Sequence, residues 1–592
     1  MQKCSYVYYI YILTITILLC KIVAMYITKS SWTNRSGKTY NSIWLKESYR
    51  DNGKVKSRYV LNLKNWPNEA IDSLQAALDA CNKTNNSPYN SSTTDKQPST
   101  LIEPQKIRLE QGPSVGALFT VFQIAQRLGI VDTLGDDFQA KLALWQICAR
   151  VIEQGSRLSA VRMANLHAAV SILQFKRGFT ENDLYDNLKW LAQHQQSIED
   201  RLFIYRYPKK DATPNLFLYD VTSSYLEGEK NELAQFGYNR DKKKGKLQII
   251  VGLLCDNNGI PVSIEVFEGN TSDHKTVLSQ IKKVKNRFGC QKVTFVGDRG
   301  MLKSAPIEDL EEAGFAYITA ITKPQIETLL QEGVLQYSLF DKSLGEVDCD
   351  GIRYIFRRNP IRALEIENKR TNKLKKIKEM LLQENTYLCE HPRAHVKTAL
   401  ERVWKKIEQL KCEQWLTISV PQEGIRSLEL SIDEKTLEEL KRLDGYYVLK
   451  TDVPKEMSAK EEIQERYKDL SLVESAFRTC KTVSLELRPL HVRLSSTTRG
   501  HVFVVMLAYM IIQELNRLWK GIDITVEEGL KHLTTLTEQK ISFPNDLKIS
   551  SIPSPSEQNE ELLKAASIIL PSHLASSDNI TVGTYNRKKK TA

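Results

Sequence analysis

Residues 216–228 read LFLYDVTSSYLEG, an apolar run with strand character that brings one carboxylate, Asp220, to its carboxyl end. A second apolar run, residues 293–297, ends at Asp298, and a predicted helix near residues 459–481 carries Glu474. Three carboxylates within a few Å repel each other by about 4 kcal/mol per pair at an effective dielectric of ~20, so such a cluster requires cations. Magnesium is the expected ion because it prefers hard oxygen ligands. A single Asp at a strand end is more often a solvated cap, and the ordered set of three favours the metal site.

Composition sets the frame for this site. The chain has 592 residues, 41% of them hydrophobic, which is enough for buried cores in several domains. The net charge of +12 favours an acidic partner such as nucleic acid only mildly, because an ordinary surface explains a small excess equally well. The ten cysteines stand singly without a CxxC pair, so neither a zinc ribbon nor a disulfide framework is indicated, and a reducing cytoplasm is expected.

The amino terminus disagrees with that expectation. Residues 4–20 are uncharged and rich in Ile, Leu and Tyr, between Lys3 and Lys21. Such a run is typical of a signal segment or a short membrane anchor, although it is marginal for a full span. We favour an upstream extension, residues 1–24, with Met25 as the working start.

The next segments change periodicity from two to about 3.6. Within residues 25–81, an alternating pattern on both sides of Asn52-Gly53 predicts a β-hairpin module. Residues 82–112 are polar and read as a linker. Residues 113–205 repeat apolar side chains every three to four positions, which predicts a helical domain, either a plain bundle or a DNA-binding one.

The central segments predict a mixed sheet. Over residues 206–324 the element order is β-β-β-α-β-α-β, as in ribonuclease-H-like α/β folds, whose ligands lie beyond strand ends. Residues 325–443 are expected to form an inserted α+β domain. Residues 444–545 then return to the sheet with the Glu474 helix, and residues 546–592 are expected to be a mobile basic tail. On that helix Tyr467, Glu474, Arg478 and Lys481 fall on one stripe beside an apolar stripe.

These residues carry a family resemblance. The chain resembles bacterial insertion-sequence transposases of the DDE type, in the insertion-sequence-four-like group with a Tyr-x2-Arg-x3-Glu-x6-Lys helix and, in one branch, an amino-terminal hairpin. Tyr467, Glu474 and Lys481 match that spacing, whereas Leu470 stands where Arg is expected. The segments YDVTSSYLEG, GYNRDKKKGKLQIIVGLLCDNNGIPVSIEVFEGNTSDHKT, FVGDRGM and LRPLHVR are similar to that group as well.

The resemblance implies a chemistry and a set of partners. Two Mg²⁺ ions, for which Mn²⁺ can substitute, would be held by Asp220, Asp298 and Glu474 for cleavage and strand transfer of DNA. No small-molecule cofactor is implied, and pairing of two DNA ends implies a homodimer that acts at the nucleoid. The residues expected to contact DNA are basic or aromatic: Arg299, Tyr467, Arg478, Lys481, Lys242, Lys243, Lys244, Arg488 and Arg493.

Each of these roles has a plainer alternative. Arg478 and Lys481 are equally consistent with surface ion pairs, Tyr467 with the core, and the lysines at 242–244 with a charged loop. For the whole chain, the alternatives are a Mg²⁺-dependent nuclease that does not join ends, a catalytically inactive DNA-binding repressor, and a membrane-anchored protein.

Overall fold

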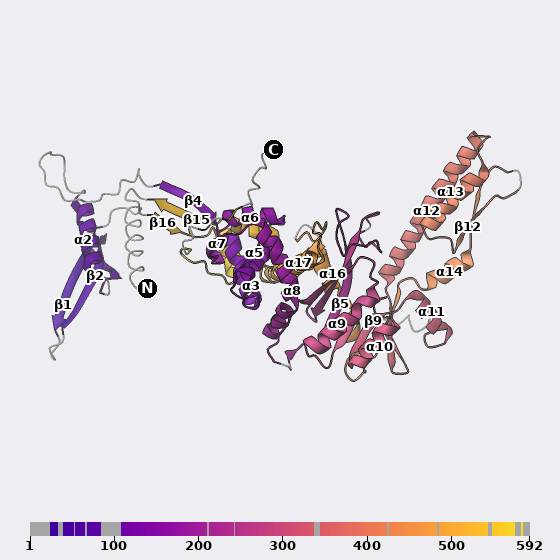
Figure 1. Cartoon of the computed structure of the whole chain (residues 1–592), viewed down its shortest axis with the longest axis horizontal. Helices are drawn as coiled ribbons and strands as arrows, with labels where there is room; N and C mark the ends of the chain where they lie inside the picture. Colours follow the sequence, from indigo (N-terminus) through magenta and orange to yellow (C-terminus); the bar gives the residue numbers. More distant parts are fainter. Residues whose placement is uncertain are drawn as a thin grey trace, which may run out of the picture. The chain divides into compact units, whose positions relative to one another are not determined.

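The structure is a computed structural model of the 592-residue chain. It divides into two compact units, residues 1–101 and 102–592 (Figure 1). The residues that it describes are 24–33, 39–51, 54–64, 68–83, 108–209, 212–241, 243–336, 344–422, 425–481, 485–542, 548–574, 580 and 582–583. The apolar segment at residues 4–20 and the Asn52-Gly53 turn lie outside these residues.

The first unit is a small antiparallel sheet with one helix. Strands β1 (Ala24–Thr33), β2 (Thr39–Asp51) and β3 (Lys54–Asn62) pair in sequence order, and α2 (Asn68–Lys83) packs against β1. The predicted hairpin of β2 and β3 is confirmed by their antiparallel register. Strand β1 and helix α2 were not predicted. The core of this unit consists of Leu45, Leu63, Ile71, Leu74 and Leu78.

The second unit begins with a helical region. Its helices are α3 (Gly116–Arg127), α4 (Ile130–Leu134), α5 (Phe138–Ile152), α6 (Arg157–Leu166), α7 (Ala169–Ile172) and α8 (Glu181–Arg206). Side-chain caps fix several starts: Asp137 accepts from the N–H of Ala140, and Thr180 and Asp183 form a capping box before α8. The predicted helical character of this region is confirmed.

These helices enclose α17 (Ser495–Leu518), which packs against α5 and α8. Among the described residues, α17 is the one helix long and apolar enough to cross a membrane, but 72% of its apolar window is buried in the protein. Helix α17 is therefore a packing helix of the protein core.

The central sheet has eight strands in the order β10-β11-β14-β9-β8-β5-β6-β7. Strands β5, β6 and β7 are antiparallel, and β5, β8 and β9 are parallel. This mixed α/β arrangement follows the predicted element order. The elements from β5 onward are β5 (Leu216–Tyr225), β6 (Gln248–Asp256), β7 (Pro261–Glu268), α9 (Asp273–Lys282), the π-helical turn η3 (Lys283–Arg287), β8 (Thr294–Gly297), α10 (Ser304–Ala313), β9 (Ala316–Ala320) and α11 (Lys323–Gln331).

The predicted insertion is smaller than expected. Strands β10 (Gly345–Cys349) and β11 (Ile352–Arg358) extend the central sheet through β14 (Tyr446–Thr451), because β11 pairs antiparallel with β14. The inserted part has a separate apolar core, and Figure 1 shows two of its helices side by side. It comprises α12 (Pro360–Glu390), α13 (Val396–Gln409), β12 (Leu416–Ser419), β13 (Glu429–Ile432) and α14 (Glu434–Arg442).

Two further expectations differ from the structure. The helix predicted over residues 459–481 is divided at Asp469 into α15 (Lys460–Lys468) and α16 (Leu470–Lys481). The expected mobile tail is wrong for residues 548–574, where α19 (Glu557–Ala565) packs against α18 (Val526–Thr534) through buried Leu562. Strands β15 (Thr537–Ser542) and β16 (Lys548–Ser551) pair there with β4 (Arg108–Ser114).

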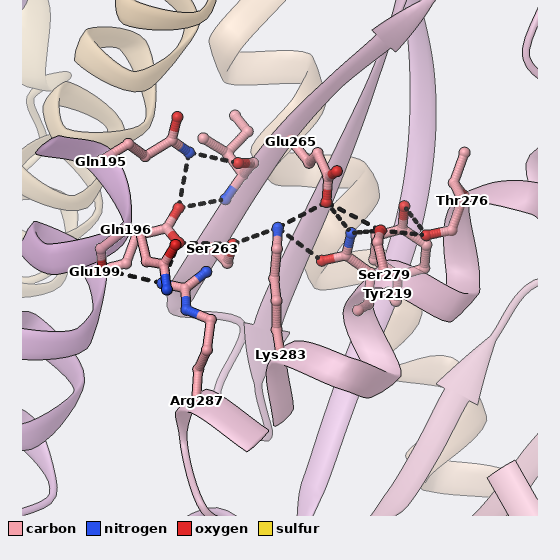
Figure 2. Close-up of polar contacts among 12 residues, drawn as sticks. Gln195, Gln196, Glu199, Tyr219, Ser263, Glu265, Thr276, Ser279, Lys283 and Arg287 are labelled. Carbon is pink, nitrogen blue, oxygen red and sulfur yellow. Dashed lines mark hydrogen bonds and ion pairs between the residues drawn. The ribbon is translucent and has the colours of Figure 1, made fainter. Parts of the chain in front are cut away.

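A polar network joins the helical region to the sheet (Figure 2). The buried carboxylate of Glu199 on α8 accepts hydrogen bonds from Ser263 Oγ at 3.0 Å and from the N–H of Ile264 at 3.2 Å, and it pairs with Arg287 at 3.0 Å. In the same view, Lys283 Nζ lies between Ser263 and Glu265, 2.7 Å from the Glu265 carboxylate. Buried charges that are paired in this way hold α8, β7 and η3 in one arrangement.

Candidate active site

Strand register brings Asp220 and Asp298 together. Strands β5 and β8 run parallel and remain paired as far as Tyr219 and Gly297. The next residue on each strand is an aspartate, and neighbouring strands lie about 4.8 Å apart. Asp220 was expected at the carboxyl end of its strand. That expectation is wrong, because β5 continues to Tyr225 beside β6. It lies where the parallel pairing with β8 ends.

Glu474 approaches Asp220 from a helix, closely enough to affect its pKa. Helix α16 packs against β5 and buries Val473 and Phe477, while Glu474 on the adjoining face is exposed. The three acids interact electrostatically. Burial raises the pKa of Asp220 to about 7, and the negative charges of Asp298 and Glu474 add to the rise, against the N–H of Val221 and the positive charge of Arg240.

Hydrogen bonds orient the two aspartates. Asp220 Oδ1 accepts from the N–H of Val221 at 2.7 Å, and Asp298 Oδ1 accepts from the N–H of Arg299 at 2.6 Å. The hydroxyl of Tyr467 also donates to Asp298 Oδ1, at 3.2 Å. Burial and the charge of Asp298 raise the pKa of Tyr467 above its ordinary value, so this phenol stays protonated and remains a donor.

The donor set fits a divalent cation in its chemistry. Three carboxylates supply hard oxygen ligands, and a partly buried carboxylate whose neighbours are also acidic is stabilised in its charged form by a cation. Across the part of the chain that the structure describes, no three His, Cys, Asp or Glu side chains are close enough to enclose a metal ion. Asp298 instead bonds to Tyr467 in this arrangement.

A buried ion network beside the acids was not predicted. Asp241, whose side chain is 2% exposed, pairs with Lys481 at 2.9 Å and with Arg488. Next to it, Arg240 donates to both carboxylate oxygens of Asp273 at 2.6 Å. The loop reads as a run of lysines, a pattern that predicts exposed positive charge and not a buried acid. An aspartate within a basic run is the signal that would have identified the network.

The residues expected to contact DNA fall into two groups. Lys481 and Arg488 are held by Asp241, and burial lowers the pKa of Lys481 although Asp241 opposes that shift. Lys243 and Lys244 are exposed on the same loop, while Lys242 lies outside the described residues. Arg299, Arg478 and Arg493 are exposed as well.

Comparison with known proteins identifies the class of this fold and site. The profile of the family described as Transposase DDE domain matches residues 211–511, just over half of the chain. The chain belongs to this family. Residues 27–93 match a second family, described as IS1634 family transposase, N-terminal domain. The protein is therefore an insertion-sequence transposase, an enzyme of the DDE type that depends on divalent metal and acts on DNA.

Other comparisons add little. No curated protein matches the sequence. One solved structure, described as a cryo-EM structure of the piggyBac transposase synaptic complex with hairpin DNA, aligns with 72% of this chain and 82% of that chain. Its sequence identity is 8% and its TM-score 0.33, so the family assignment rests on the two profiles alone.

Proposed function

We propose that Asp220, Asp298 and Glu474 are the catalytic and metal-binding acids of this transposase. The observation that carries the proposal is the parallel register of β5 and β8, which puts Asp220 and Asp298 directly beyond paired residues. The response of the Asp220 pKa to both other acids supports a shared site. The strand order β7-β6-β5-β8-β9 around these acids supports a ribonuclease-H-like core.

Mg²⁺ is the proposed metal, as two ions for which Mn²⁺ can substitute. Such ions would polarise an attacking oxygen and neutralise the leaving 3′ oxygen at the scissile phosphate. In strand cleavage the attacking oxygen belongs to water; in strand transfer it belongs to the freed 3′-hydroxyl, so one phosphodiester bond forms as another breaks. Residues of the chain position the acids: Val221 and Arg299 through backbone N–H groups, and Tyr467 through its hydroxyl.

Basic residues around the acids are proposed to hold the DNA backbone. Arg299, Arg478 and Arg493 are exposed cations, and Lys243 and Lys244 add positive charge on the loop beside Asp241. Lys481 and Arg488 position that loop through Asp241, and phosphate contact by either is a further proposal. For Lys242 and Tyr467, DNA contact likewise stays a proposal.

Several finer features belong to the same proposal. The substrate is the terminal repeats of the element together with target DNA, the active assembly is a homodimer, and the enzyme works in the cytoplasm at the nucleoid. Membership of the branch with the Tyr-Arg-Glu-Lys signature rests on Tyr467, Glu474 and Lys481, with Leu470 in the Arg position.

Replacement of each acid tests the site. We expect Asp220→Asn, Asp298→Asn and Glu474→Gln each to lower Mg²⁺-dependent cleavage of the element's DNA ends at least about 100-fold, with DNA binding retained. Glu308→Gln and Asp523→Asn change exposed acids elsewhere and should leave cleavage unchanged. Full cleavage by any of the three acid variants contradicts the assignment. Supply of a pre-cut end separates strand transfer from cleavage alone.

A further inference from the structure

A second site lies between the helical region and the segment at residues 486–492. Residues from the end of α5 to the start of α6, helix α8, this segment and helix α17 line a cavity of about 290 Å³. Basic side chains dominate its wall, and Glu486 is its one acid. The residues that line the cavity are Arg150, Gly155, Ser156, Arg157, Tyr185, Glu486, Arg488, Pro489, His491, Val492 and His501.

Two buried arginines give the cavity its charge. The side chains of Arg150 and Arg157 are both more than nine-tenths buried. Arg157 bonds to His501 Nδ1 at 3.0 Å, and its Nε has no hydrogen-bond partner among the described residues. Burial lowers the pKa of Arg157 to about 9, and repulsion from Arg150 adds to the shift. A structural arginine at this depth normally has a carboxylate partner, because an unpaired buried charge is strongly destabilising.

His501 does not neutralise the charge of Arg157. Burial and the neighbouring Arg157 hold the pKa of His501 well below its ordinary value, so His501 is neutral and accepts from Arg157. Glu486 interacts with Arg150 rather than with Arg157. The cavity therefore presents an excess of guanidinium groups, whose planar donors match the oxygens of a phosphate.

We infer that this cavity binds a backbone phosphate of the DNA on which the transposase acts. The inference rests on the DNA-acting function given above and extends it to a site separate from the three acids. Exposed Arg493, one residue beyond the cavity wall, favours DNA over a free anion because it offers a second cation beside the first. His491 and Val492 also line a neighbouring hollow of about 500 Å³, whose wall carries Lys230 and Arg493 together with Glu227 and Glu229.

The cavity is also connected to the catalytic helix. Arg488 lines it and pairs with Asp241, which pairs in turn with Lys481 at the end of α16. A DNA strand held in the cavity therefore touches the same loop, residues 486–493, that fixes the helix carrying Glu474. The site adds a phosphate contact at the boundary of the helical region. None of the other predicted DNA-contact residues lies on a helix of that region.

Ser156 offers a test that spares the fold. It is exposed, lines the cavity and caps α6 by accepting from the N–H of Ser159 at 3.1 Å. Asp and Asn serve equally well as N-caps, so Ser156→Asp adds a negative charge to the cavity and Ser156→Asn is its neutral control. We expect Ser156→Asp, in the full chain with Ca²⁺, to weaken binding of a duplex carrying the element's end about tenfold. The slope of log affinity against log salt should fall by about one phosphate contact.

The outcomes separate this inference from the proposed catalytic site. Equal affinities and equal salt slopes for Ser156→Asp and Ser156→Asn overturn it. A second result also overturns it: inorganic phosphate raises the melting temperature of the parent but not of Ser156→Asp, while the two proteins bind DNA equally well. The cavity would then bind a free anion. Retained metal-dependent cleavage by Ser156→Asp at saturating DNA, with weaker binding, is the expected pattern. Variants of Asp220, Asp298 and Glu474 should show the reverse pattern, with DNA binding kept and cleavage lost.

As a second variant, Arg157→Met removes the unpaired guanidinium directly. Its melting temperature should equal or exceed that of the parent, because an unpaired buried charge is lost, whereas DNA affinity should fall about tenfold. A stable Arg157→Met protein with parental DNA affinity overturns the inference.

Discussion

Leu470 stands where the proposed Tyr-Arg-Glu-Lys signature has an arginine, and its environment explains why a leucine is stable there. The side chain is 7% exposed and belongs to the main apolar core at the start of α16. An arginine at this point would place a charged group in this apolar core. The apolar residue therefore contributes packing that anchors the helix carrying Glu474.

Restoration of the signature should consequently destabilise the protein. We expect Leu470→Arg to lower the free energy of unfolding by about 3 kcal/mol, because a buried unpaired charge replaces apolar packing. The melting temperature measures the effect. Leu472→Arg changes a leucine that is 37% exposed on the same helix and should be close to neutral. A more stable or more active Leu470→Arg protein contradicts this account.

Asp220 illustrates what could be predicted at the scale of single residues. An apolar run that meets an acid predicts a place on the sheet for both Asp220 and Asp298, and the register of β5 and β8 confirms that the two residues follow paired positions. Asp241 was missed because its partners, Lys481 and Arg488, lie more than 200 positions away in the sequence. Arg157 was missed because a helix with apolar periodicity gives no indication that one of its buried cations has no carboxylate partner among the described residues.

At the scale of elements, the junction between α8 and the sheet depends on Arg287. Its guanidinium pairs with buried Glu199 at 3.0 Å and with Asp200 at 2.8 Å. We expect Arg287→Met to cost about 3 kcal/mol, because Glu199 is left buried without its cation. Differential scanning calorimetry would report the loss. Lys282→Met, an exposed lysine one residue before η3, should leave the melting temperature unchanged.

The same junction predicts a dependence on pH. Burial opposes ionisation of Glu265, but Lys283 and the donors Gln280 and Ser279 outweigh it and lower the pKa of Glu265 below its ordinary 4.5. A lowered folded-state pKa contributes stability that is present above about pH 4.5 and is lost as the pH falls through the folded value. Urea unfolding should be measured from about pH 3.5 to about pH 7 in steps of about 0.5. The free energy of unfolding should depend less steeply on pH for Glu265→Gln than for the parent. Glu268→Gln, exposed on the same strand, should follow the parent.

Element identity was easier to predict than element pairing. The strands β5 to β9 and the buried helix α17 follow from apolar runs of the right length. The place of β11 in the central sheet could not be read from the sequence, because its partner β14 lies across the whole insertion. The break between α15 and α16 at Asp469 was also missed, since the apolar pattern continues on both sides.

At the scale of the whole molecule, the net charge of +12 predicts how DNA binding responds to salt. Each phosphate neutralised by a basic residue releases a counterion, so affinity should fall steeply as salt rises. We expect Arg493→Gln to reduce the slope of log affinity against log salt by about one unit in fluorescence anisotropy titrations. Lys435→Gln on α14 should not change the slope, and an unchanged slope for Arg493→Gln would remove Arg493 from the DNA surface.

The pairing of β11 with β14 has a consequence for how this protein can vary. The two strands flank the insertion, and the N–H of Asn359 donates to the carbonyl of Gly445 at 2.8 Å, so the chain leaves and re-enters the sheet at adjacent points. Whatever is spliced between those points, whether a longer arm or a bare turn, imposes no strain on the strands that hold the acids. The junction between β11 and β14 is thus an insertion point, at which related enzymes can carry different inserted segments on the same catalytic core.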